Sequence, residues 1–331
     1  MSDFRTLPDL ASERLGGRAI LANDEFFAPK ENLTLDAEPV LDPARYTDRG
    51  KWMDGWETRR RREPGHDWCL VRLGVRGIVR GVVVDTAHFR GNHPESASLE
   101  AAGVEVEPGH WDDVEWTPLV ERSPLAGDAP NRFGVQDERP WTHVRLSIYP
   151  DGGVARLRIH GEAAPDWDLL ANSAPPGGVE VAALPRGGVV MACSDEFFGT
   201  PIHLLLPGDA EGMWDGWETR RRRGPGYDWV LVRLGRRTRV ERVELDTRHF
   251  KGNYPESARV EAIDARGASA EDLAADGAAW RELVPRTLLR PDHAHLFEPP
   301  ALSPVEATHV RLSIFPDGGV ARLRVRGALL E

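Results

Sequence analysis

A chain of 331 residues, 40% of them hydrophobic and 29% charged, is long enough for two ordinary domains that each bury a core. The formal net charge of −11 argues against nucleic-acid binding as the main task. No apolar run approaches the length of about 18 residues that a membrane-spanning helix needs, and no signal-like segment follows the N-terminus. We therefore expect a cytoplasmic protein with no nucleic-acid or membrane partner.

The chain begins with a predicted irregular lead-in over residues 1–18. A strand is expected over 19–27, where it ends in the letters Asp-Glu-Phe-Phe, and the same strand and turn recur over 189–198. Residues 28–51 are rich in Pro, Asp and Asn, which predicts a loop.

The next stretch, Asp54–Gly74, is the most strongly repeated part of the chain. Its sequence, DGWETRRRREPGHDWCLVRLG, recurs at Asp215–Gly235 with 18 of 21 positions identical. A core strand needs only apolar residues at the right period, so the preserved polar and charged letters indicate a role beyond packing. The stretch ends in a predicted strand, Trp68–Leu73.

A second predicted strand, Ile78–Asp85, leads into a turn-rich loop. The loop, DTAHFRGNHPESA at Asp85–Ala97, recurs as DTRHFKGNYPESA at Asp246–Ala258. Its Gly, Asn and Pro residues are typical of turns. A further strand is predicted over Leu99–Glu107.

The third repeated block, Thr142–Gly161, matches Thr308–Gly327 at 17 of 20 positions. Apolar and polar residues alternate on both sides of the letters Pro-Asp-Gly-Gly, which predicts a β-hairpin. Helical signal is weak throughout, and Ala270–Leu283 is the one fair helix candidate.

Short alternating strands between turns predict an all-β fold. The two copies predict two tandem β-sandwich domains related by an internal repeat, over 19–162 and 179–331, with a linker over 163–178. The two cysteines, Cys69 and Cys193, are not matched between the copies. We expect them to be buried small hydrophobic residues, not a disulfide framework or a metal site.

The arginine run Arg59–Arg62 recurs as Arg220–Arg223. Such a run could simply be a solvated charge cluster, but four adjacent guanidinium groups repel one another, so their duplication favours specific partners. Strand alternation would send two arginines to each side. Some would then pair with nearby acids, while others could hold a carboxylate ligand, which the planar guanidinium group binds well.

Several acids and one histidine are shared by the repeated loops. Asp151 fits a turn role, whereas Glu57 and Glu95 are harder to explain by turn chemistry. His88 shares its loop with Asn92 and Glu95, a grouping that fits either general acid–base chemistry or a hydrogen-bonded loop core. The sequence contains no H-x-x-x-H, C-x-x-C, G-x-S-x-G or Gly-rich phosphate loop, so neither a metal nor a cofactor is expected.

Taken together, the letters DEFFAPKENL, KWMDGWETRRRR, VDTAHFRGNHPESA and RLSIYPDGGVARLR resemble the allantoicase family over nearly the whole chain. The resemblance implies two jelly-roll, galactose-binding-like β-sandwiches. It also implies a hydrolase that converts allantoate to ureidoglycolate and urea in purine degradation. The alternative hypothesis is a tandem, non-catalytic module that binds a small ligand or a carbohydrate.

With allantoate as substrate, the duplicated loops supply a cation for its carboxylate, polar groups for its two ureido arms and an acid–base group for the departing nitrogen. The substrate-binding candidates are Trp56, Arg59, Arg62 and Asn92, with their counterparts Trp217, Arg220, Arg223 and Asn253. The catalytic candidates are Glu57, His88 and Glu95, with their counterparts Glu218, His249 and Glu256. The duplicated loops also fit a composite site between copies of the chain, so a homo-oligomer is expected.

Overall fold

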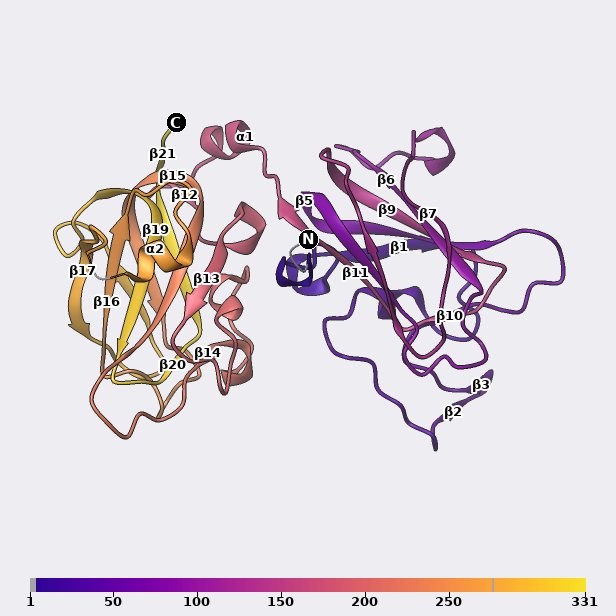
Figure 1. The fold of residues 1–331 in the computed structure, drawn as a ribbon, viewed down its shortest axis with the longest axis horizontal. Coiled ribbons are helices and arrows are strands. Elements are labelled where there is room, and N and C mark those ends of the chain that lie inside the picture. The colour runs from indigo at the N-terminus through magenta and orange to yellow at the C-terminus, as the bar shows by residue number, and fades with distance from the viewer. Residues whose placement is uncertain (1–3, 276) are drawn as a thin grey trace. The chain divides into compact units, whose positions relative to one another are not determined.

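The computed structural model describes residues 4–275 and 277–331, which form two compact units with their boundary between Ala164 and Pro165. Both units are built almost entirely from strands, which confirms the all-β prediction (Figure 1). The first unit contains β1 (Arg18–Ala22), β2 (Tyr46–Thr47), β3 (Gly50–Lys51), β4 (Trp56–Glu57), β5 (Asp67–Asp85), β6 (Ser96–Ala102), β7 (Thr117–Pro124), β8 (Pro130–Gly134), β9 (Pro140–Tyr149), β10 (Gly153–Val154) and β11 (Arg156–Ala163). The second contains α1 (Trp167–Asn172), β12 (Val179–Glu180), β13 (Val189–Cys193), β14 (Trp217–Glu218), β15 (Asp228–Asp246), β16 (Ser257–Ile263), α2 (Ala270–Ala274), β17 (Arg281–Leu288), β18 (Ala294–Phe297), β19 (Val305–Phe315), β20 (Gly319–Val320) and β21 (Arg322–Leu329).

One long strand organises each unit. The first part of β5 lies between β1 and β9, and the sheet continues through β6 to β7. The second part of β5 lies between β11 and β8. In the second unit β15 plays the same part, first between β13 and β19 and then between β21 and β18. The two strands predicted over 68–73 and 78–85 are therefore one continuous strand.

The predicted hairpin over Thr142–Gly161 is wrong. Among the described strands, β9 pairs with β5 and β6, whereas β11 pairs with β5, so the strands on the two sides of the Pro-Asp-Gly-Gly turn are not partners. The alternating pattern does mark the buried face, because Val144, Leu146, Leu157 and Ile159 are fully buried. Alternation specifies which side chains face the core, and it leaves the partner strand open.

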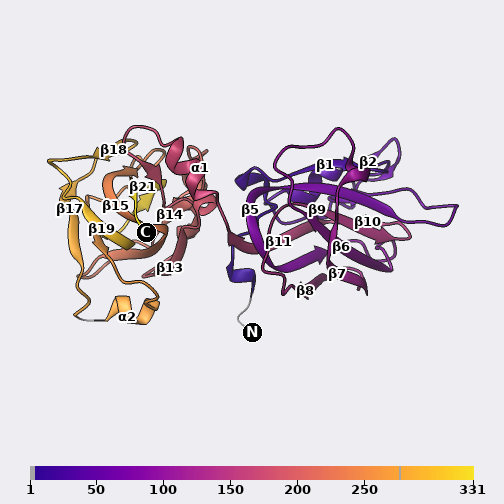
Figure 2. The ribbon, with the colours of Figure 1, turned by 90° about the horizontal axis from the view of Figure 1, so that it is seen from above.

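Only the start of the helix candidate Ala270–Leu283 is helical. Ser269 and Asp272 form a capping box that begins α2, but the helix ends at Ala274 and β17 begins at Arg281. A capping box marks where a helix begins and does not set its length. Figure 2 shows α2 at the margin of the second unit, outside its strands.

Other predicted boundaries also shift. The strand expected over Leu99–Glu107 is β6, which ends at Ala102. The lead-in contains short 3-10 turns at Phe4–Thr6 and Glu13–Leu15, and its residues 1–3 lie outside the described part of the chain. The expected linker contains α1, where the side chain of Asp166 accepts a hydrogen bond from the backbone N–H of Leu169.

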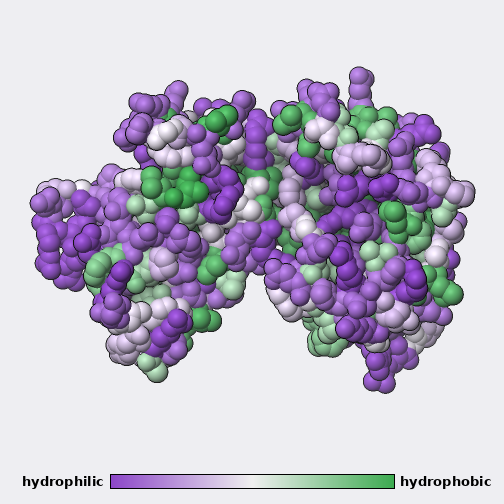
Figure 3. Space-filling view, turned by 180° about the vertical axis from the view of Figure 1, so that it is seen from behind, coloured by the Kyte–Doolittle hydropathy of each residue, from purple (hydrophilic) through white to green (hydrophobic). Residues whose placement is uncertain are grey.

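The apolar residues of the long strands lie inside each unit. Figure 3 shows one face of the molecule, where the surface is mostly hydrophilic and hydrophobic patches are small and scattered. Cys69 is fully buried and Cys193 is partly buried, and both are free thiols. Within residues 4–275 and 277–331, no helix is both long and apolar enough to cross a membrane.

Candidate active site

A two-stranded ribbon brings the arginine-containing stretch next to the Pro-Asp-Gly-Gly turn in each unit. β4 pairs with β10, and β14 pairs with β20; the second of these ribbons is seen at one end of its unit in Figure 1. The backbone N–H of Thr58 donates to the carbonyl oxygen of Gly152, and the Gly152 N–H donates to Thr58 Oγ1, both at 3.1 Å. Thr58 is buried, so these hydrogen bonds join the arginine-containing stretch to the turn beneath the protein surface.

The Asp-Thr-x-His-Phe loop packs against the same turn through a buried phenylalanine. Phe89 is fully buried, and its ring lies only 2.0 Å from where a Cβ on Gly153 would be. Phe250 has the same relation to Gly319, also at 2.0 Å. A side chain larger than glycine would push the phenylalanine away, so glycine is required at these two positions.

An amide–carboxylate hydrogen bond connects the Gly-Asn-x-Pro-Glu-Ser loop to the ribbon. Asn92 Nδ2 donates to Glu57 Oε1 at 2.7 Å, and Asn253 Nδ2 donates to Glu218 Oε1 at 2.6 Å. Burial raises the pKa of Glu57, although the hydrogen bond from Asn92 opposes this rise. Glu57 is therefore a carboxyl group that keeps a proton to higher pH than an exposed glutamate, as a general acid should.

Two of the four arginines are held by acids. The backbone N–H and Nε of Arg59 donate to the Asp24 carboxylate at 2.9 and 2.7 Å. Arg61 Nη1 donates to the buried Asp67 at 2.6 Å, and the Arg61 backbone N–H donates to Asp151 at 2.9 Å. These contacts hold the loop in place and leave Arg59 and Arg61 with anionic partners of their own.

The second copy repeats this arrangement. Arg220 Nε donates to Asp195 at 3.0 Å, and Arg222 forms an ion pair with the buried Asp228. The backbone N–H of Arg222 donates to Asp317 at 2.7 Å. The same acids thus hold the same alternate arginines in both repeats.

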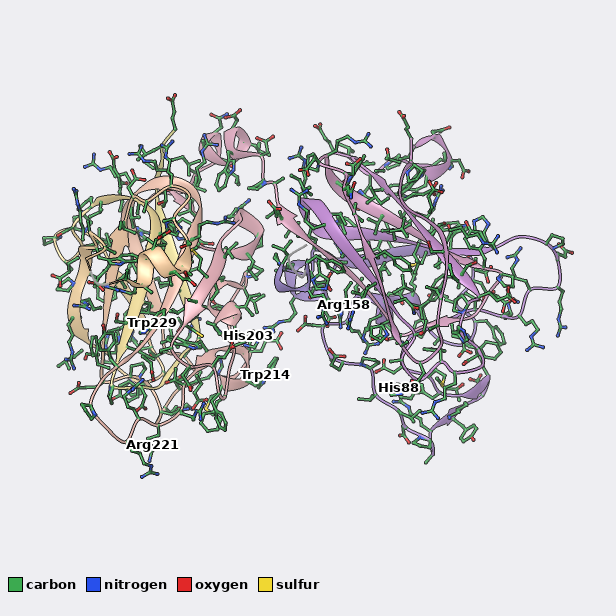
Figure 4. All side chains as sticks on the ribbon, viewed as in Figure 1. His88, Arg158, His203, Trp214, Arg221 and Trp229 are labelled. Carbon is green, nitrogen blue, oxygen red and sulfur yellow. The ribbon has the colours of Figure 1, made fainter. Side chains whose placement is uncertain are left out.

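The other two arginines of each run, Arg60 and Arg62 with their counterparts Arg221 and Arg223, are exposed. Within the described part of the chain, none of these four side chains has an acidic partner. Figure 4 shows Arg221 at the end of the second unit where β14 and β20 lie. These are the guanidinium groups that remain available to a ligand.

A cleft of about 780 Å³ in the second unit brings these groups together. Its lining includes Phe198, Glu218, Arg221, Arg223, Asn253, Tyr254, Glu256, Leu288 and Asp317. Unpaired guanidinium groups therefore share one cleft with a carboxyl–amide pair and an apolar wall. This combination suits a small anion that also carries hydrogen-bond donors and acceptors.

The opposite side of the arginine run also borders open space. In the first unit a cavity of about 830 Å³ is lined by all four arginines together with Asp24 and Asp67. On that side the guanidinium groups of Arg59 and Arg61 already bind those acids. The side of Glu57 and Asn92 is therefore the better candidate for a ligand site.

Known proteins similar to this chain identify its family. A family model described as "Allantoicase repeat" matches residues 8–164 and 179–330. A "Probable allantoicase" of Pseudomonas aeruginosa (strain UCBPP-PA14) is 48% identical, over 98% of this chain and 97% of its own length. The chain belongs to the allantoicase family.

Further relatives agree with this assignment to the allantoicase family. A "Probable allantoicase" of Nocardia farcinica is 48% identical, over 98% of this chain and 95% of its own length. The crystal structure of the Saccharomyces cerevisiae allantoicase has a TM-score of 0.80 at 35% identity and covers 98% of this chain and 96% of its own. A second allantoicase structure has a TM-score of 0.79 at 36% identity and covers 97% of this chain and 93% of its own. These structures confirm the predicted pair of jelly-roll domains.

The two tryptophans predicted to contact substrate serve another purpose in this allantoicase-family fold. Trp56 and Trp217 are fully buried. The indole N–H of Trp56 donates to the carbonyl oxygen of Asp24, and that of Trp217 donates to the carbonyl oxygen of Asp195, both at 2.8 Å. Neither ring has surface left for a ligand, so the substrate-binding prediction is wrong for this pair.

The histidines belong to the loop core and not to the cleft. His88 and His249 adopt left-handed backbone conformations with φ of 70° and 71°. Their Nε2 atoms bond to the carbonyl oxygens of Pro39 at 3.1 Å and Ala210 at 2.8 Å. His249 is absent from the residues that line the described cleft. Both histidines therefore fit the hypothesis of a hydrogen-bonded loop core. The geometry does not support the catalytic prediction for them.

The remaining predicted site residues differ in whether they line the cleft. Arg59 and Arg220 are held by Asp24 and Asp195, which removes them from the set facing the cleft. Glu256 lines the cleft, where its Oε2 accepts a hydrogen bond from Arg286 Nη2 at 3.1 Å; its counterpart, Glu95, is exposed.

Sequence reasoning missed Arg60 and Arg221. The signal for both was available, because residues two apart in an extended stretch face the same side. Choosing Arg62 and Arg223 therefore implied choosing Arg60 and Arg221 as well. The part of the chain that the structure describes contains no group of three or more His, Cys, Asp or Glu side chains placed to hold a metal ion.

Proposed function

We propose that this chain hydrolyses allantoate to ureidoglycolate and urea, using the cleft at the end of the sandwich. The observation that carries the proposal is the arrangement of Arg221 and Arg223 in one cleft with the hydrogen-bonded pair Glu218 and Asn253. The allantoicase-family relatives support the same activity, since their names state it.

The groups of the cleft match the substrate one by one. Allantoate carries one carboxylate and two ureido arms on a single carbon. The two unpaired guanidinium groups provide forked donors for the carboxylate. Asn253 Nδ2 has a second N–H, and its Oδ1 is an acceptor, so the amide can bind a ureido arm while it still holds Glu218. Phe198 and Leu288 form the apolar part of the lining against which the bound arms can pack.

The reaction breaks the bond between the central carbon and one ureido nitrogen. In the proposed mechanism the protonated glutamate gives its proton to that nitrogen, and the electron pair of the C–N bond leaves with urea. The other ureido nitrogen shares its lone pair with the central carbon, forming a transient C=N bond. Water adds to this carbon, and the glutamate takes back a proton from the water, which yields ureidoglycolate.

A glutamate that starts protonated fits the environment in the first repeat, where burial raises the pKa of Glu57. The carboxyl group ends the cycle protonated, so no other proton donor is required. The alternative is a carbohydrate-binding module, but the two free guanidinium groups of this cleft suit an anionic ligand better than a neutral sugar.

Urea release from allantoate by the purified protein tests the proposal. We expect steady urea formation that is lost in the double variant Glu57→Gln/Glu218→Gln, which keeps the shape of both side chains. A wild-type protein that releases no more urea than a heat-killed sample would overturn the proposed function.

A further inference from the structure

We infer that each chain carries two complete catalytic sites, one in each repeat, and that each site turns over without the other. This inference rests on the proposed function and extends it, because the chemistry alone requires only one site. It comes from comparing the two repeats of this chain contact by contact.

The hydrogen bonds that define the site are present twice. The amide–carboxylate bonds measure 2.7 Å from Asn92 to Glu57 and 2.6 Å from Asn253 to Glu218. The threonine before each arginine run is buried in both repeats and bonds to the second residue after the proline of the turn, at 3.1 Å in each case. The acid–base group and its amide partner are therefore positioned alike in both repeats.

The contacts that orient the arginines are also present in both repeats. The backbone N–H of the third arginine donates to the turn aspartate at 2.9 Å for Arg61 and 2.7 Å for Arg222. In both repeats the first and third arginines pair with acids, while the second and fourth are exposed and unpaired among the described residues. Both repeats therefore offer a free pair of guanidinium groups.

Within the described part of the chain, the second and fourth arginines of each run have no ion pair that would preserve them in an idle copy. Among the described residues these arginines have no acidic partner, and adjacent like charges repel one another. In the first repeat burial raises the pKa of Glu57, so this half-buried carboxyl group costs stability when it is ionised. An idle copy would therefore gain stability by losing these residues, yet both copies keep all of them.

The differences between the repeats lie in the walls of the site. His93 replaces Tyr254, and Pro124 stands where Leu288 does in the strand register. The connection between Asp-Glu-Phe-Phe and Asp-Gly-Trp is longer in the first repeat, with 26 intervening residues against 16. In that repeat Arg49 Nη1 donates to the carbonyl oxygen of Phe26 at 2.7 Å.

The longer connection changes how open each site is. A phenylalanine lies at the edge of each site. Its exposed fraction is 38% for Phe27 in the first repeat and 63% for Phe198 in the second. The walls therefore differ in shape and apolar area, while the reacting groups remain the same. We expect the two sites to differ in KM more than in mechanism.

Each set of reacting groups also comes from within one repeat. The second-repeat cleft of about 780 Å³ contains the acid, the amide and both free arginines from its own loops. A cleft of this size exceeds what a ligand with about twelve heavy atoms needs, since pockets of roughly 300 to 1,000 Å³ hold larger molecules. In the second repeat, no group has to be borrowed from the first.

Single and double isosteric variants test the inference. We expect Glu57→Gln and Glu218→Gln each to keep a measurable part of the wild-type kcat, with the two residual values summing to that of the wild type. The double variant should fall by more than a hundredfold. Glu121→Gln, an exposed residue of β7 outside the site, is the matched control and should retain full activity.

Two results would overturn the inference while leaving the proposed function intact. Loss of all activity in either single variant would show that the chain has one working site or that the two copies depend on each other. Calorimetric titration of the double variant with allantoate should give two equivalents per chain, and fewer than two would contradict the inference. Failure of the proposed function is a different outcome, because the wild type would then release no urea.

Discussion

Neighbouring arginines in the repeated run should respond to substitution in opposite ways. Arg61 pairs at 2.6 Å with Asp67, whose side chain is only 2% exposed. In an Arg61→Ala variant this carboxylate would keep one side-chain donor, Asn23 Nδ2 at 2.9 Å. Leaving a buried charge without its partner costs about 3–5 kcal/mol.

Partial exposure reduces that cost. The Arg61 side chain is 28% exposed, so water can partly replace the lost guanidinium group. We therefore expect Arg61→Ala to lower the free energy of unfolding by about 2–3 kcal/mol. For a unit of this size, that corresponds to a fall in Tm of roughly 4–12 °C.

The adjacent position should show the reverse behaviour. Arg62 and Arg223 are exposed and have no acidic partner in the described part of the chain, so replacing both with alanine should change stability by less than about 0.5 kcal/mol. Removing a charge-assisted hydrogen bond to the substrate carboxylate costs about 1.5–3 kcal/mol. This predicts a fall in kcat/KM of roughly 10- to 150-fold.

Thermal melting followed by circular dichroism, together with a coupled urea assay, measures both effects. The reasoning fails if Arg62→Ala/Arg223→Ala melts as early as Arg61→Ala. It also fails if the double variant keeps the wild-type kcat/KM, because the free arginines would then not meet the substrate.

Three further predictions follow from single contacts. Because folding raises the pKa of Glu57, protonation of this carboxyl group stabilises the fold. The contribution is fully present below the unfolded pKa, near 4.5, and is lost as pH rises through the folded pKa. Glu57→Gln should therefore be more stable than the wild type at pH 7 and no more stable at pH 4, as measured by urea unfolding. The double variant Asp151→Ala/Asp317→Ala removes the carboxylates that accept the backbone N–H groups of Arg61 and Arg222. KM should therefore rise several-fold in initial-rate assays, and Asn at the same two positions should bring KM part of the way back. Burial raises the pKa of the Cys69 thiol strongly and that of Cys193 to about 11, so mass spectrometry after iodoacetamide treatment at pH 8 should find Cys69 unmodified and Cys193 modified slowly.

The internal repeat marks the loops that form the proposed site. Polar residues identical in two copies mark the loops that carry Glu57 and Asn92. Strand alternation predicts that half of the arginines are structural, which agrees with the pairing of the first and third arginines with acids. Both features depend only on local chain geometry, which a sequence pattern reports well.

The failures concern contacts made with the main chain. Trp56 and His88 are identical between the copies and have polar atoms, so they resembled ligand-binding residues. Their nitrogens bond instead to the carbonyl oxygens of Asp24 and Pro39. Every residue has a backbone carbonyl oxygen, so the sequence does not indicate which one will accept such a hydrogen bond.

Interleaving of structural arginines with those that we propose bind the ligand explains why the run is four arginines long. The first and third arginines hold the loop against buried or half-buried acids, and this fixes the direction of the second and fourth. A free arginine pair without the paired one would be mobile, and binding would then have to order two long side chains at a cost of about 0.5–1.5 kcal/mol each. At Arg61 the Nη1 nitrogen donates both to Asp67 and to the carbonyl oxygen of His66, while the backbone N–H donates to Asp151. Two of the four positions therefore serve the fold, and the other two serve the anion that we propose the cleft binds.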